Sequence, residues 1–144
     1  MVNYLLPNRS DLMLRLSSNP RNVSRVEAFV ERIAHKYKIA PDLYGNILIS
    51  LTEAVNNAII HGNDKDETKT VEVLLSEAED AIALQVRDEG GGFDFRSLPD
   101  PTAAENLTRI GGRGVFLMHQ LSDSVDFQDN GSTVEMRFSL NQQR

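Results

Sequence analysis

The sequence contains no cysteine among its 144 residues. The chain can therefore form neither a disulfide framework nor a thiolate metal site, and it fits a reducing compartment. It also lacks an apolar run long enough to span a membrane, and its first residues do not combine a basic segment with a long apolar one, as a signal peptide would. We expect a soluble, unexported protein of the cytoplasm, without membrane association.

Positive charge is also scarce. Fifteen Lys and Arg residues stand against 21 Asp and Glu residues, which gives a formal net charge of −6. This excess disfavours direct binding to nucleic acid, because contact with phosphates requires a basic patch. The 40% of hydrophobic and 25% of charged residues are typical of a globular domain, and the length suits one domain over residues 1–144. We expect the partners to be proteins or small molecules.

Hydrophobic periodicity predicts a strand and two helices in the first half of the chain. Leucines at alternate positions predict an edge strand over residues 11–16. Asn19 is a suitable cap for a first helix that packs one face against the core. Pro41 can open a second helix, which Gly62 can end, and residues 63–69 are predicted to form a polar loop.

The second half of the chain predicts two antiparallel hairpins. Residues 71–75 and 82–86 alternate and form the first, and residues 125–127 pair with 134–140 through a glycine-containing turn. Residues 93–111 show no sustained period. A connection of this length is unusual in a compact domain, and we interpret it as a lid.

A polar stripe interrupts the second predicted helix. Glu53, Asn57 and His61 recur at four-residue intervals inside an apolar run, and on a helix they lie along one side. Glu53 and Asn57, together with Asn46 and Ser50, form a polar stripe that predicts the rim of a cleft. On its own the stripe is better explained as a solvated helix face, and His61 is better explained by the helix dipole than by metal binding.

Two glycine-rich segments follow. The first hairpin runs into Asp88 and Gly90–Gly92, where glycine permits turns and close backbone approach to a ligand. Gly111–Gly114 then leads into a short apolar helix, whose amino terminus would present free amide groups to a phosphate. Taken alone, each segment fits a tight turn or close packing as well as a nucleotide site.

Together, ExxxNAxxHG at residues 53–62, DxGxG at 88–92 and the glycine turn at 112–114 resemble the GHKL ATPases. Within them, the chain is most similar to the small anti-sigma-factor serine kinases of the SpoIIAB and RsbW type, over nearly its whole length. The resemblance implies the Bergerat ATP-binding fold, an α/β (two-layer α+β) sandwich. In it, helices cover one face of a mixed, mostly antiparallel sheet, and ATP lies between helix and lid.

The resemblance also implies roles for individual residues. Asn57 would ligate Mg²⁺, which prefers oxygen ligands and retains several waters. Glu53, one helical turn away, would be the general base of phosphoryl transfer. Asp88 would accept a hydrogen bond from the adenine amino group, since an ionised carboxylate only accepts, and Gly90 and Gly92 would shape that pocket.

Four further positions follow from the same resemblance. Gly112 and Gly114 would lie beside the phosphates, and Arg113 between them is loosely similar to a residue that contacts the γ-phosphate. Thr133 would lie near adenine.

We therefore expect an ATP- and Mg²⁺-dependent serine/threonine kinase that phosphorylates a STAS-domain antagonist and sequesters a sigma factor, with a homodimer implied by the resemblance. A second hypothesis is a nucleotide-responsive module that switches partners without transferring phosphate. A sensor histidine kinase is disfavoured, because we find neither a dimerisation helix nor a phospho-accepting histidine in the sequence.

Overall fold

Five strands form one sheet in the order β1-β2-β3-β5-β4, and every neighbouring pair is antiparallel. The computed structural model describes residues 12–90 and 112–142. The strands are β1 (Met13–Ser17), β2 (Thr70–Ala78), β3 (Ala81–Arg87), β4 (Ser124–Gln128) and β5 (Thr133–Ser139). The sheet confirms both predicted hairpins and places the first predicted strand at an edge.

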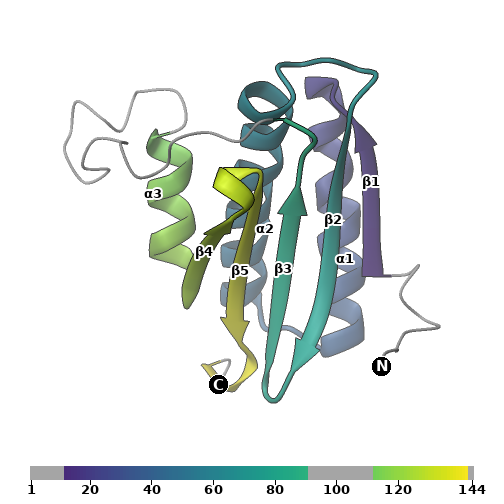
Figure 1. Ribbon diagram of the computed structural model, residues 1–144. Coiled ribbons are helices and arrows are strands. Elements are labelled where there is room, and N and C mark those ends of the chain that lie inside the picture. The colour runs from purple at the N-terminus through teal and green to yellow at the C-terminus, as the bar shows by residue number, and fades with distance from the viewer. Residues whose placement is uncertain (1–11, 91–111, 143–144) are drawn as a thin grey trace, which may run out of the picture.

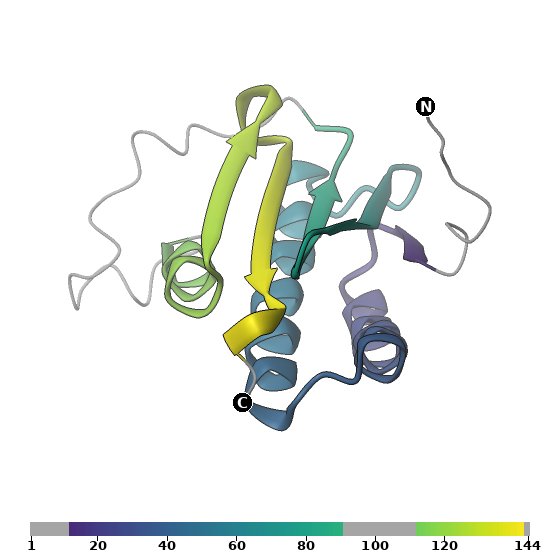
Figure 2. The same cartoon turned by 90° about the horizontal axis from the view of Figure 1, so that it is seen from below.

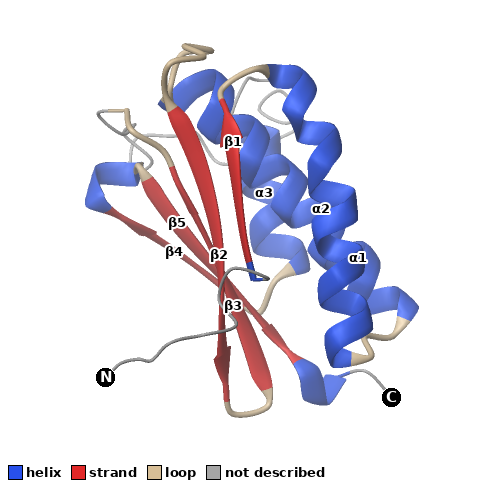
Figure 3. Cartoon of the chain, turned by 90° about the vertical axis from the view of Figure 1, so that its right-hand side faces the viewer, coloured by secondary structure: helices blue, strands red, loops and turns tan. Residues whose placement is uncertain are grey.

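The helices α1 (Arg25–Tyr37), α2 (Pro41–Asn57) and α3 (Gly112–Leu121) all pack on one face of the sheet (Figures 1 and 3). Seen from below, α2 lies beneath the middle strands, with α1 and α3 on either side of it (Figure 2). This is the two-layer α/β arrangement that the resemblance implied. Among the described residues, no helix is both long and apolar enough to cross a membrane.

The core lies between the two layers because strand residues alternate in direction. Each of four strands turns its buried apolar residues toward the helices, namely Leu14 and Leu16 in β1, Val71, Val73 and Leu75 in β2, Ile82, Leu84 and Val86 in β3, and Val134, Met136 and Phe138 in β5. From the helices, α1 and α2 contribute Val26, Phe29, Val30, Ile33, Ile47, Leu51, Ala54 and Val55. One continuous core therefore fixes α2 across the middle of the sheet.

Several boundaries differ from the sequence prediction. The side chain of Asn19 accepts a hydrogen bond from Arg21 N at 2.9 Å, as a cap does, but it opens the 3-10 turn η2 (Pro20–Ser24) rather than α1 itself. Ser50, predicted at the rim of a cleft, is fully buried. The predicted lid, residues 93–111, lies outside the described residues.

Candidate functional site

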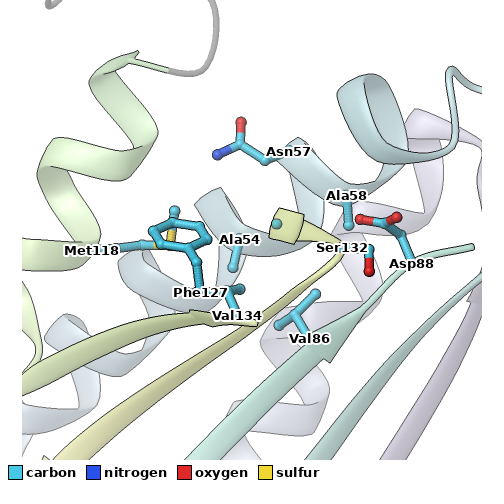
Figure 4. A pocket seen from close by; sticks show the side chains of 10 residues that line it. Ala54, Asn57, Ala58, Val86, Asp88, Met118, Phe127, Ser132 and Val134 are labelled. Carbon is cyan, nitrogen blue, oxygen red and sulfur yellow. The ribbon is translucent and has the colours of Figure 1, made fainter. Parts of the chain in front are cut away.

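A pocket opens between the helical layer and the ends of β3, β4 and β5. Its lining comes from segments distant in sequence, and comprises Ala54, Asn57, Ala58, Val86, Asp88, Met118, Phe127, Gly131, Ser132 and Val134. Met118 and Phe127 lie on one side of it, and Asp88 and Ser132 lie on the other (Figure 4). Small-molecule sites are mostly apolar with a few polar groups. This pocket has that composition.

The end of α2 has an unusual backbone that shapes the pocket. After Asn57 the chain continues as the π-helical turn η3 (Ala58–Gly62), in which Asn63 N donates to Ala58 O at 2.8 Å. π-helical turns are rare in proteins, and those that occur are often found at functional sites. The π-helical turn directs Gly62 toward the loop that follows β3. The predicted helix end at Gly62 is therefore confirmed, with a different local geometry.

Asp88 is held at the end of β3 by two backbone contacts. Its amide N donates to Ser132 O at 2.9 Å, and its Oδ1 accepts from Gly90 N at 2.8 Å. A Cβ atom on Gly62 would overlap the Asp88 carboxylate, and one on Gly90 would overlap the carbonyl oxygen of Gly62. Both glycines are therefore needed for the close approach of the two segments.

The surroundings of Asp88 raise the pKa of its carboxyl group. The largest cause is burial, which penalises the charged form, while the hydrogen bond from Gly90 N and the charge of Lys69 oppose it. A half-buried carboxylate aimed at an apolar pocket is a strong acceptor for an amino group of a ligand. Perturbed carboxyl groups of this kind are concentrated at functional sites.

This pKa shift predicts opposite pH effects on stability and on binding. A raised pKa in the folded state means that the stability contributed by Asp88 is present below its ordinary pKa and is lost as the pH rises through the raised value. Adenosine should instead bind more weakly as the pH falls through that raised value, because a protonated carboxyl loses its charge-assisted bond. Thermal melts and adenosine titrations from about pH 7 to about pH 4 test this, since that range contains carboxyl pKa values. Asp88→Asn should abolish the pH dependence of adenosine binding, and the difference in melting temperature between this variant and the unaltered chain should change with pH. Persistence of the binding trend in the variant, or a difference in melting temperature that does not change with pH, would contradict the assignment.

Glu53 and Asn57 meet the start of α3. A Cβ atom on Gly114 would lie 3.0 Å from Glu53 Oε1 and 3.1 Å from Asn57 Nδ2. Both side chains of the predicted stripe therefore converge on one point of α3, where Gly114 is buried. Gly112 and Gly114 belong to the first turn of this helix, which corrects the prediction that the glycine turn precedes it.

The close approach of Glu53 and Asn57 to Gly114 predicts that a substitution there will change nucleotide affinity but not the fold. Gly114→Ala should leave the fold intact, because alanine favours a helix by about 1 kcal/mol over glycine. The new methyl group would push the ends of the Glu53 and Asn57 side chains slightly away from α3. We expect the affinity for Mg²⁺ and ATP to fall about tenfold, the equivalent of about 1.4 kcal/mol. Melting temperature and calorimetric titration measure the two effects.

Gly45→Ala is the matched control for that variant. Gly45 lies in α2, and a Cβ atom there would meet nothing within 4 Å. This variant should gain similar helix stability without any change in nucleotide affinity. Equal affinities for the two variants would contradict the role given to Gly114.

Of the other residues that the sequence predicts for the site, Thr133 and Arg113 are not among those that line the pocket. Thr133 is buried but does not line the pocket, and its Oγ1 donates to Asp129 Oδ2 at 3.2 Å. Its neighbours in sequence, Ser132 and Val134, line the pocket instead. Arg113 is exposed on α3. Gly92 lies outside the described residues.

Sequence reasoning missed the apolar half of the pocket. Met118 and Phe127 were assigned to a helix and a strand by their periodicity, which does not distinguish a core residue from the wall of a pocket. Ser132 belongs to the terminal turn over residues 131–133 that also fits the resemblance, but no role was predicted for it.

Over residues 12–90 and 112–142, an antiparallel sheet carries the helices on one face and a pocket lies between helix and strand ends, an arrangement that fits an ATPase domain of the histidine kinase type. The sequence agrees, since residues 16–138 match the family of the histidine kinase-like ATPase domain, and the chain belongs to that family.

Curated relatives specify the type within this family. The chain is 30% identical to "Serine-protein kinase RsbW" of Bacillus licheniformis, over 91% of this chain and 86% of that protein. It is 28% identical to the protein of the same name from Bacillus subtilis, over 96% and 92%. The resemblance to the GHKL ATPases of the RsbW type is therefore confirmed.

A solved structure supports the fold alone. It is the histidine kinase domain of a blue-light activated histidine kinase from Erythrobacter litoralis, with a TM-score of 0.53 at 19% identity. The match covers 84% of this chain and 62% of that one, so the chain spans less than two thirds of its length.

Proposed function

We propose that the chain is a serine/threonine protein kinase that uses ATP with Mg²⁺ in the pocket described above. The observation that carries the proposal is the convergence of Glu53, Asn57 and Gly114, at a helix edge that also lines the pocket containing Asp88. The relatives named serine-protein kinase support the reaction type.

In this proposal the apolar pocket receives the adenine ring. Asp88 accepts a hydrogen bond from its exocyclic amino group, and this favours adenine over guanine, which presents a carbonyl oxygen there. Apolar side chains from α3 and β4, Met118 and Phe127, exclude water from the ring. The half-buried carboxylate of Asp88 at one side of an apolar surface supports this placement of the ring.

The helix edge of the pocket would hold the phosphate end. Asn57 supplies one amide oxygen for Mg²⁺, which with phosphate oxygens and waters is a sufficient ligand set. When bound, the ion supplies charge neutralisation to the phosphates and orients them. The first turn of α3 lies opposite Asn57, and the amide groups of a helix's first turn, which have no partner within the helix, suit an anion.

Glu53 would act on the protein substrate. Its carboxylate accepts the proton of a serine or threonine hydroxyl while that oxygen forms a bond to the γ-phosphorus. The bond between the γ-phosphorus and the bridging oxygen breaks, and ADP leaves. Its position one helical turn before Asn57 would bring the base close to the phosphates that Mg²⁺ would orient.

The proposed partners follow from the family type. The phosphorylated protein would be a STAS-domain antagonist, and the unphosphorylated antagonist and a sigma factor would compete for the kinase, which we expect to be a cytoplasmic homodimer. The alternative is a nucleotide-binding module that exchanges the same partners without turnover.

Incubation with γ-labelled ATP and candidate STAS-domain proteins tests the proposal. We expect label on one serine or threonine of the antagonist, located by mass spectrometry, and dependence of the label on Mg²⁺. Binding of ATP and the antagonist without any transfer of label would contradict the kinase and favour the alternative.

A further inference from the structure

Asn63 is one of the few polar residues with no exposed surface. It follows the π-helical turn η3, where the sequence predicts a polar surface loop, yet its exposed fraction is 0%. Burial of an amide is costly unless all its hydrogen-bonding groups are satisfied. The contacts of Asn63 meet this condition.

Its side chain bonds three separate segments. Nδ2 donates to Thr70 O at 3.0 Å and to Ser18 Oγ at 2.8 Å, and Oδ1 accepts from Glu89 N at 2.8 Å. The orientation of the amide is unambiguous, because a backbone carbonyl can only accept and a backbone N–H can only donate. Both donor hydrogens and the acceptor are thus used.

The contact with Glu89 N is the one that concerns the pocket. Glu89 directly follows Asp88, whose own amide N is bonded to Ser132 O on the other side. The backbone at Asp88 is therefore held at two adjacent amides, one by the turn before β5 and one by Asn63. Removal of either bond should loosen the peptide that orients the Asp88 carboxylate.

The other two contacts anchor Asn63 itself. Ser18 is fully buried after β1, and its Oγ donates to Lys69 O at 2.9 Å. Thr70 begins β2, and its N–H and Oγ1 donate to the carboxylate of Glu89, the latter at 2.7 Å. Asn63 is thus fixed to the sheet from one side, while its oxygen reaches the loop of the pocket from the other.

We propose that Asn63 is a positioning residue that determines the preference for adenine by holding the Glu89 amide and, through it, the Asp88 carboxylate. The inference rests on the proposed function, since it requires adenine to bind at Asp88. Asn63 is not among the residues that line the pocket, so its effect on the base is indirect.

The ratio of ATP to inosine triphosphate affinity isolates this role. The two nucleotides differ in the exocyclic group that Asp88 would read, because inosine carries a carbonyl oxygen in place of the amino group. A residue with a merely structural role would change the stability, or both affinities together. A positioning residue would change their ratio.

The experiment measures both affinities by calorimetry for the full chain and its variants. The unaltered chain should prefer ATP by about tenfold or more, since one hydrogen bond to a charged group contributes at least that much. In Asn63→Leu, which removes all three bonds at similar volume, the preference should fall toward unity. Asn63→Ala, which leaves space for water, serves if the leucine variant does not fold.

Ser18→Ala is the matched control, because it removes one anchor of Asn63 and keeps the bond to Glu89. It should lower the melting temperature and retain the preference for ATP. An unchanged preference in a folded Asn63 variant, or an equal loss in Ser18→Ala, would overturn the positioning role. An unaltered chain that binds neither nucleotide would instead refute the proposed function, and one that binds both equally would refute the role of Asp88.

Discussion

Glu53→Gln is expected to lower the rate of phosphate transfer by a factor of about 10² to 10⁴, the usual contribution of a general base. The amide has the same shape as the carboxylate but cannot accept the proton of the attacking hydroxyl. Nucleotide affinity should be almost unchanged, because the contact between residue 53 and Gly114 remains possible. Single-turnover transfer of labelled phosphate to the antagonist measures the first quantity, and calorimetry measures the second.

Glu79→Gln is the control for this experiment. Glu79 is exposed at the turn between β2 and β3 and does not line the pocket. Its replacement makes the same change of charge without a change in rate. A Glu53→Gln variant that transfers phosphate at the normal rate would show that the base lies elsewhere, even if the chain remains a kinase.

Asn57→Ala should remove the dependence of nucleotide binding on Mg²⁺. We expect the affinity for ATP in the presence of Mg²⁺ to fall by about 10-fold to 100-fold, the range found when groups that support a metal site are removed. The fold should persist, since alanine is the stronger helix former. The affinity for ATP, measured by calorimetry, should differ between solutions with Mg²⁺ and with a chelator for the unaltered chain. For the variant, the two affinities should be equal.

Asn56→Ala provides a close comparison, because Asn56 is the adjacent residue of α2 and does not line the pocket. Its side chain projects about 100° around the helix from that of Asn57. This variant should keep the effect of Mg²⁺ on affinity. If Asn57→Ala also kept it, the metal would have other ligands.

Local patterns in the sequence predicted the elements of the fold well. The alternation of apolar residues in β2, β3 and β5 matches the face that each strand buries, because a side chain's direction in a strand depends only on its position. The resemblance of three separated motifs identified the family. Asn57 and Asp88 do line one pocket, as convergence of these motifs requires.

The features that were missed depend on contacts between distant segments. Asn63 and Ser50 are polar, and nothing adjacent to them in sequence indicates that they are fully buried. Glycine is common in turns because its backbone is unrestricted, but packing of α3 against α2 places Gly114 in a helix. Such outcomes follow from tertiary structure, which overrides local propensity.

Titration of the unaltered chain and of Asp88→Asn with ATP and Mg²⁺ tests the central claim most directly. The account predicts saturable binding of one nucleotide per chain, with an affinity at least about tenfold weaker in Asp88→Asn because a bond to a charged group is lost. Absence of saturable heat in the unaltered chain at about millimolar ATP, where binding of only about −4 kcal/mol would still be detected, would contradict it. Equal affinities for the two proteins would place the nucleotide somewhere other than the pocket at Asp88.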